Sequence, residues 1–340
     1  MGNTLHITNG DGAGSLLKAA NIEGDVLPWR DTMQSGPFPK GLSLEEHSKI
    51  RAEYFSGPAM PLSDVTRDFE IRDEHLKAFK NYEEVILWFE HDLLDQLQIL
   101  QILQFFHGQD LKGKKLSLVC INEYEGIIPF RGLGQLSPEH IEALVPIKRP
   151  INEEHLKIAN AGWQAFCEPD PTHLETYIQS DLSSLPFLKA ALMRHLEEYP
   201  SLKNGLNKTQ NKILELVRNG VTNPVQNFIE FMNSETVFFM GDWTHFREIS
   251  KMCNGEQPLL SCSPNGKFLS PPDHEIEMED FKDQILSLTD LGEKVMDGKR
   301  DAAELIKLDQ WLGGVHLEYA KPLWRWDEKT EKLMKTEKLA

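Results

Sequence analysis

The stretch VILWFEHDLLDQLQILQ, residues 85–101, decides the fold because it joins a strand pattern directly to a helix pattern. Its first half is an unbroken apolar run, which is typical of a strand buried on both faces of a parallel sheet. Its second half predicts an apolar helix. The joint holds three consecutive polar residues, Glu90, His91 and Asp92, and Asp95 follows one helical turn later.

These polar residues have two interpretations. If His91 opens the helix, it shares a face with Asp95 and lies beside Asp92, so that one turn can hold a divalent metal or pair a general base with an orienting carboxylate. Alternatively, Asp92 caps the helix and Asp95 is favoured by the helix macrodipole. Gln96, one turn after Asp92, is a candidate ligand-orienting amide. The local sequence leaves both interpretations open.

Strand and helix patterns alternate on both sides of this stretch, throughout residues 1–134. This alternation predicts βαβ units and an open, mostly parallel α/β sheet of the Rossmann-like kind. The expected strands are residues 4–8, 24–29, 84–90 and 115–121, and the expected helices are residues 10–22, 42–55, 72–82 and 91–108. Ser43 and Glu46 have the spacing of a capping box at the start of the second helix.

The pattern changes to helices from about residue 135. We expect a helical connecting segment at 135–205, in which the charged run around Arg194 is a solvated helix face. Residues 206–300 read as three short amphipathic helices followed by a two-strand element centred on a Pro-Asn-Gly turn, which is the winged-helix order. Residues 301–340 form a tail that contains Trp311, Trp324 and Trp326 and ends in a charged, solvated segment.

Ligands of open parallel sheets bind beyond the carboxyl ends of the strands, and here each of those ends is polar. The first strand runs into Asn9, Gly10 and Asp11, the second into Arg30, and the third into the residues around His91. We expect these side chains to lie along one rim of the sheet.

The first two strand ends also have simpler explanations. Glycines at a helix start let a backbone approach a phosphate, but Asp11 would repel that phosphate unless a cation lay between them. A tight turn, with Asp11 or Ser15 capping the helix, accounts for the same residues. Arg30 is a candidate anion clamp, or else one half of a surface pair with Asp31. Trp29 is expected in the core.

Composition narrows the classes of partner. The net charge of -17 disfavours broad binding to nucleic acid, although it does not exclude a local basic strip. No apolar run is long enough for a membrane span, and residues 1–12 lack the features of a signal peptide. The four cysteines have no metal-binding spacing, which indicates reduced thiols in the cytoplasm.

Several blocks of the chain together resemble a bacterial family catalogued as domain of unknown function 1835. The N-terminal blocks are LHITNGDGAG, VLPWRDTMQSGP and ILWFEHDLLDQLQ, and the later ones include LPFLKAALMRHLEEYPSLKNGLNKTQNKILE, FMGDWTHF, SLTDLGEKVM and DQWLGGVHL. The resemblance implies a bacterial cytosolic protein. Some members of the family are labelled as sigma-factor-like, and the family has no established activity. The chain matches the family pattern at every one of its positions here, which are Asn9, Gly10, Asp11, Trp29, Arg30, Gly36, Pro37, His91, Asp92, Asp95 and Gln96.

We therefore expect an enzyme or binding protein for a phosphorylated or nucleotide-like small molecule, of the hydrolase or transferase class. His91, Asp92 and Asp11 are the catalytic candidates, and Asn9, Gly10, Arg30, Asp95 and Gln96 are the ligand-binding candidates. A divalent metal is a candidate cofactor. The alternative is a regulatory protein that senses a ligand and contacts DNA or protein through its winged helix. The substrate and the oligomeric state are not encoded in any recognisable motif.

Overall fold

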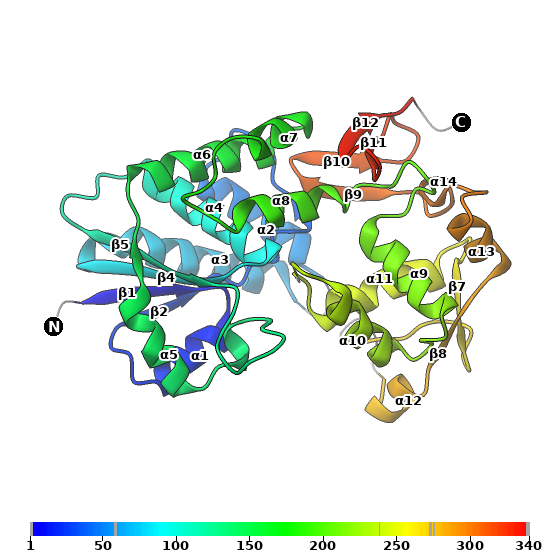
Figure 1. Cartoon of the computed structure of the whole chain (residues 1–340), viewed down its shortest axis with the longest axis horizontal. Helices are drawn as coiled ribbons and strands as arrows, with labels where there is room; N and C mark the ends of the chain where they lie inside the picture. Colours follow the sequence, from blue (N-terminus) through cyan, green and yellow to red (C-terminus); the bar gives the residue numbers. More distant parts are fainter. Residues whose placement is uncertain (1–2, 58–59, 238, 272–273, 275, 338–340) are drawn as a thin grey trace. The chain divides into compact units, whose positions relative to one another are not determined.

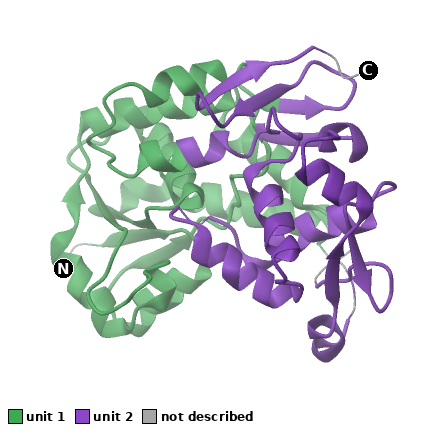
Figure 2. Cartoon of the chain, turned by 45° about the vertical axis from the view of Figure 1, so that its right-hand side comes forward, with its two compact units in different colours: residues 1–192, 313–315 green, residues 193–312, 316–340 purple. Residues whose placement is uncertain are grey.

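The computed structural model describes residues 3–57, 60–237, 239–271, 274 and 276–337, which form two compact units. Unit 1 comprises Met1–Leu192 with Gly313–Val315, and unit 2 comprises Met193–Leu312 with His316–Ala340 (Figure 2). The chain is a mixed α/β protein with a mostly parallel five-stranded sheet, so the expected fold class is confirmed at that level. Among the described residues, no helix is both long and apolar enough to span a bilayer.

Unit 1 alternates strands and helices, as expected. In chain order it contains β1 (Thr4–Thr8), α1 (Asp11–Ala19), β2 (Asp25–Pro28), β3 (Gly36–Pro37), α2 (Leu44–Phe55), α3 (Leu62–Lys77), β4 (Glu84–Glu90), α4 (Leu93–His107), β5 (Lys115–Ile121), η2 (Leu133–Gln135), α5 (Pro138–Leu144), β6 (Arg149–Pro150), α6 (Glu153–Cys167) and α7 (Thr172–Ile178), with short 3₁₀ turns at Ala78–Asn81 and Val145–Ile147. Helix α8 (Leu188–Leu196) crosses into unit 2.

The main sheet has the strand order β2-β1-β4-β5-β6. The first four strands are parallel, and β6 is antiparallel to β5. The chain leaves β1 toward β2 on one side and later returns to β4 on the other side, so the strand order reverses between β1 and β4. In open α/β sheets, the carboxyl end at such a reversal is where the crevice for a ligand forms.

Strand β4 lies at the centre of this sheet and is buried on both faces. Ile86 and Trp88 pack with α1 and α5 on one face, and Leu87 and Phe89 point to the other face because side chains alternate along a strand. Figure 1 shows α1 and α5 on one side of the sheet and α4 and α6 on the other. Helix α4 is buried over most of its surface, as expected for a helix packed between the sheet and α6.

Three predicted strands, at residues 4–8, 84–90 and 115–121, have the same bounds in the structure. Ser43 and Glu46 form the predicted capping box of α2. Helix α3 begins at Leu62 rather than Arg72, and the short edge strand β6 was not expected. Strand β6 adds an antiparallel edge strand beside β5, and the other four strands remain parallel.

The structure contradicts one of the two interpretations of Arg30, a surface pair with Asp31. Asp31 is buried and accepts hydrogen bonds from Arg51 Nε and Nη2, at 3.1 and 2.7 Å. Arg51 belongs to α2, so this ion pair fixes the segment after β2 against that helix. Trp29 is fully buried and donates from Nε1 to Gln101 Oε1, which confirms its expected place in the core.

Unit 2 is helical at first and then contains short strands. Its elements are α9 (Lys208–Arg218), α10 (Pro224–Ser234), α11 (Asp242–Asn254), β7 (Leu260–Ser263), α12 (Met278–Lys282), β8 (Ile285–Leu288), α13 (Asp290–Met296), α14 (Ala302–Leu305), β9 (Asp309–Gly313), β10 (Val315–Glu318), β11 (Trp324–Asp327) and β12 (Lys332–Lys335). The three expected helices are followed by the antiparallel pair β7–β8. The Pro264-Asn265-Gly266 turn follows β7, but β8 lies further along the chain, beyond α12.

The tail after residue 301 contains the strands β9–β12, with Trp326 buried in β11. One expectation for the C-terminal half is wrong. The run around Arg194 is not a solvated helix face, since Arg194, His195 and Glu198 are all buried. Long-range ion pairs, which are described below for unit 2, account for this burial.

Three residues near the C-terminus complete unit 1. The Phe38 N–H donates to the Gly313 carbonyl at 2.9 Å, and the Gly314 N–H donates to the Phe166 carbonyl at 2.9 Å. A Cβ added at Gly314 would lie 1.9 Å from the Cys167 carbonyl oxygen, so only glycine allows this close approach.

Candidate functional site

The joint between β4 and α4 is built by hydrogen bonds to carboxylates. Helix α4 begins at Leu93, and Asp92 is its N-cap, accepting from the Asp95 backbone N–H at 2.9 Å. The capping interpretation of Asp92 therefore describes its geometry, and His91 lies before the helix rather than inside it. Asp95 is fully buried and accepts from the Glu90 backbone N–H at 2.6 Å.

Asn9, at the end of β1, bridges to this joint. Its Nδ2 donates to Asp95 Oδ1 at 3.1 Å and to Glu90 Oε1 at 3.4 Å. Glu90, Asp92 and Asp95 are all buried, and each offers a carboxylate oxygen within 4.8 Å of the others. We call these three residues the acidic triad. The strand-order reversal between β1 and β4 thus brings Asn9 and the acidic triad together at the carboxyl end of the sheet.

Further groups hold Glu90 in place. Gln96 Nε2 donates to the Glu90 carbonyl at 2.7 Å, and the Cys120 thiol donates to the same oxygen at 3.2 Å. The Leu133 backbone N–H donates to Glu90 Oε1 at 2.6 Å. Gln96 therefore orients the end of β4, which is a positioning role.

Gly132, the residue before η2, faces Glu90 closely. Its φ is +150°, and a Cβ built there would lie 2.3 Å from Glu90 Oε2. Glycine thus allows the loop backbone to cover the carboxylate. Sequence reasoning quoted Glu90 but did not select it as a site residue, and it missed Gly132, Leu133 and Cys120. The only sequence feature that indicated Glu90 was its place as a polar residue at the end of an apolar strand. No local sequence pattern indicated Gly132, Leu133 or Cys120.

Burial and mutual repulsion control protonation in the acidic triad. Burial, reinforced by the neighbouring Asp92 charge, raises the pKa of Glu90 to about 8. Burial raises the pKa of Asp92 to about 7 against two backbone hydrogen bonds that lower it. The pKa of Asp95 is raised well above its usual value by burial and by both neighbours. The acidic triad therefore holds protons near neutral pH, or else requires a cation.

Asp11 and Arg30 form a separate, exposed pair. Arg30 Nη2 and Nε donate to the two Asp11 oxygens at 2.6 and 2.8 Å, and this partner holds the pKa of Asp11 below its usual value. Gly10 is the N-cap of α1 and lacks a capping side chain, so neither Asp11 nor Ser15 caps this helix end. Arg30 has a φ of 53°, a backbone conformation that is uncommon outside glycine.

The remaining candidate, His91, is half-buried between Glu90 and Asp92, with its ring 6.2 Å from the Phe187 ring. The structure therefore brings together Asn9, Asp92, Asp95 and Gln96 through their contacts with Glu90 or with each other. It joins Asp11 to Arg30 at the neighbouring strand ends.

The donor set of the acidic triad suits two kinds of chemistry. Carboxylates with pKa values near neutrality can exchange protons with a bound molecule at physiological pH. Carboxylate oxygens are also the ligands that hard divalent cations prefer, and a cation would replace the protons.

No protein-family model matches the chain, and no curated protein matches it. The resemblance to domain of unknown function 1835 thus stays a prediction.

We predict that the acidic triad makes the protein less stable as the pH rises. The unfolded carboxyls release their protons near pH 4, whereas the folded Glu90 and Asp92 keep theirs to about pH 8 and about 7. Stability is therefore lost between about pH 4 and 8. Relative to wild type, Asp92→Asn, which keeps a capping side chain, should gain about 2 kcal/mol between pH 5.5 and 8.5 in urea unfolding.

The matched control is Asp110→Asn, because Asp110 is exposed in a loop. Its pH profile should run parallel to that of wild type. If Asp92→Asn also ran parallel to wild type, burial would not be holding protons in the acidic triad.

Substituting Gly132 should disturb the cover over Glu90. We expect Gly132→Ala to lower the free energy of unfolding by about 2 kcal/mol, since the new Cβ collides with the carboxylate and the positive φ is unfavourable for alanine. Gly134→Ala, where a Cβ would meet no atom within 4 Å, serves as the control. Equal denaturation midpoints for the two variants would contradict the close packing of Gly132 on Glu90.

Proposed function

We propose that unit 1 is an enzyme that binds a phosphorylated or nucleotide-like small molecule at the carboxyl ends of β1 and β4. The observation that carries this proposal is the convergence of Asn9 and the buried acidic triad at the point where the strand order reverses. Clusters of buried carboxyls with shifted pKa values are characteristic of functional sites. We propose with this function that the sheet is Rossmann-like and that the chain belongs to the family catalogued as domain of unknown function 1835.

The anionic part of the ligand would meet the start of α1. A Cβ added at Gly10 or Gly12 would meet no atom within 4 Å, so the backbone there is open to an approaching group. Helix N-termini favour anions, and the exposed Arg30 guanidinium can form paired hydrogen bonds to a phosphate. Arg30 would have to exchange Asp11 for this phosphate, unless a cation allows both to bind.

The reacting part would meet the acidic triad. Glu90 or Asp92 would donate or accept the proton of a hydrolase or transferase reaction, and Asn9 and Gln96 would keep them in position. If a divalent cation bound here, the acidic triad would instead supply its oxygen ligands, and the cation would polarise a phosphoryl oxygen. The four free cysteines fit a cytoplasmic setting for this chemistry.

A ligand-sensing regulatory protein is the second candidate. The order α9, α10, α11 followed by the β7–β8 pair favours it, because winged-helix modules share that order. The charge opposes DNA as the partner: the net charge is -17, and Lys251 of α11 is paired with Glu248 at 2.6 Å. Salt-sensitive retardation of duplex DNA in a gel would support this candidate over the enzyme.

A thermal-shift screen with and without Mg²⁺ tests the lead proposal. ATP, AMP and glucose 6-phosphate serve as probes, and we expect at least one to raise Tm by roughly 3 °C. Arg30→Gln should remove that shift, whereas Arg67→Gln, at an exposed site on α3, should keep it. Asp92→Asn should retain binding and lose turnover.

Two results would overturn the proposal. One is the absence of a shift with every phosphorylated probe under both metal conditions. The other is an equal shift in Arg30→Gln and Arg67→Gln, which would place binding away from the β1 and β2 strand ends.

A further inference from the structure

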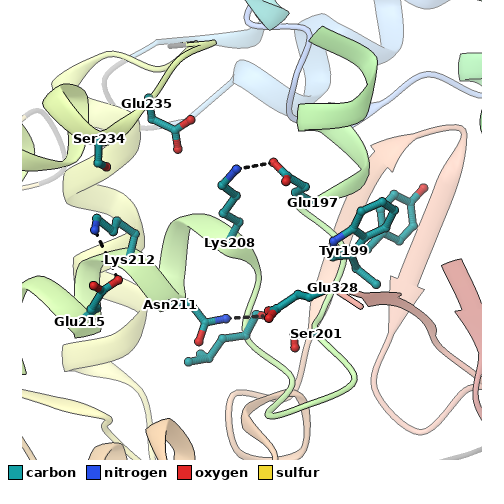
Figure 3. A pocket seen from close by; sticks show the side chains of 12 residues that line it. Glu197, Tyr199, Ser201, Lys208, Asn211, Lys212, Glu215, Ser234, Glu235 and Glu328 are labelled. Carbon is teal, nitrogen blue, oxygen red and sulfur yellow. Dashed lines mark hydrogen bonds and ion pairs between the residues drawn. The ribbon is translucent and has the colours of Figure 1, made fainter. Parts of the chain in front are cut away.

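Unit 2 contains a cavity of about 360 Å³ that neither candidate function uses. It is bounded by the segment after α8, by α9, by the end of α10 and by β11 with its turn, all within unit 2 (Figure 3). This volume is at the lower end of the range for small-molecule sites. The side chains that line the cavity indicate the class of ligand it would bind.

Two backbone hydrogen bonds fix one wall of the cavity. The Leu202 N–H donates to the Trp326 carbonyl and the Trp326 N–H donates to the Pro200 carbonyl, both at 2.9 Å. These bonds join β11 to the segment after α8. Trp326 and Tyr199 line the cavity there, and both are buried.

A buried arginine fixes a carboxylate on the opposite wall. Arg194 donates from Nε and Nη2 to the two Glu235 oxygens, each at 2.9 Å, and from Nη1 to Glu198 at 2.6 Å. Thr209 connects to both Arg194 and Glu198. Glu235 therefore lines the cavity as a preorganised carboxylate, and one guanidinium serves two carboxylates.

The remaining charges of the lining do not balance. Lys208 is paired with Glu197 at 2.6 Å, and Lys212 with Glu215 at 3.3 Å (Figure 3). Glu328 also lines the cavity, is exposed, and makes no hydrogen bond or ion pair with the described residues. Both ammonium groups thus have carboxylate partners, and carboxylate charge remains in excess.

We propose that this cavity binds a small organic cation of the polyamine class. Excess carboxylate favours an ammonium ligand over an anion, and carboxylates form strong charge-assisted hydrogen bonds to ammonium groups. Aromatic side chains stabilise cations as well as the alkyl segments between amines. An anion would have to compete with Glu197 and Glu215 for the two lysines.

Calorimetric titration of the full chain with spermidine tests this proposal. We expect one site per chain with Kd below about 1 mM at low salt, weakening as salt rises. Glu328→Gln should weaken binding about fivefold, the effect of losing one exposed charge contact. Glu331→Gln, an exposed change in the same hairpin outside the cavity lining, is the matched control and should bind as wild type does.

Inorganic phosphate provides the opposing probe. The net charge of -17 attracts polyamines to many weak surface sites, so equal weakening in both glutamine variants, or a stoichiometry well above one, would overturn the proposal. Binding of phosphate in place of spermidine would also overturn it and would assign the cavity to an anion held by Lys208 and Lys212.

Discussion

The buried carboxylate of Asp95 is the interaction on which the centre of unit 1 depends. It accepts the Glu90 backbone N–H where the strand ends and the helix begins, and it also receives the Asn9 amide. One side chain thereby connects the ends of β1 and β4 to the first turn of α4. A buried polar backbone group must find such a partner, so the cost of burying Asp95 is offset by the joint it completes.

The same interaction is part of a buried cluster of three carboxyl groups. Asp95 requires Glu90 and Asp92 as close neighbours, and the mutual repulsion of the three favours protons or a cation. A local solution to backbone hydrogen bonding has therefore produced groups whose ionisation responds to pH near neutrality. Burial of these carboxyls makes stability lower than an apolar joint would give.

Local physics made much of unit 1 predictable from sequence. The apolar run of β4, the cap at Asp92 and the capping box at Ser43 each depend on residues within a few positions, and the structure confirms all three. Reasoning failed where a partner is distant in sequence. Asp31 is paired with Arg51 and Arg194 with Glu235, and no local pattern distinguishes such buried pairs from solvated charges. The strand ends were expected to share one rim, but only tertiary structure shows that Arg30 engages Asp11 while Asn9 engages the acidic triad.

The short segment Gly313–Val315 has a consequence for how the chain folds during synthesis. Unit 1 is encoded almost entirely before residue 193, yet the Phe38 N–H and the Phe166 carbonyl are hydrogen-bonded to Gly313 and Gly314. A nascent chain on the ribosome must therefore keep that edge of unit 1 incomplete while nearly all of unit 2 is translated. Closure of that edge of unit 1 therefore waits for residues 313–315, which follow Met193–Leu312 of unit 2 in the chain.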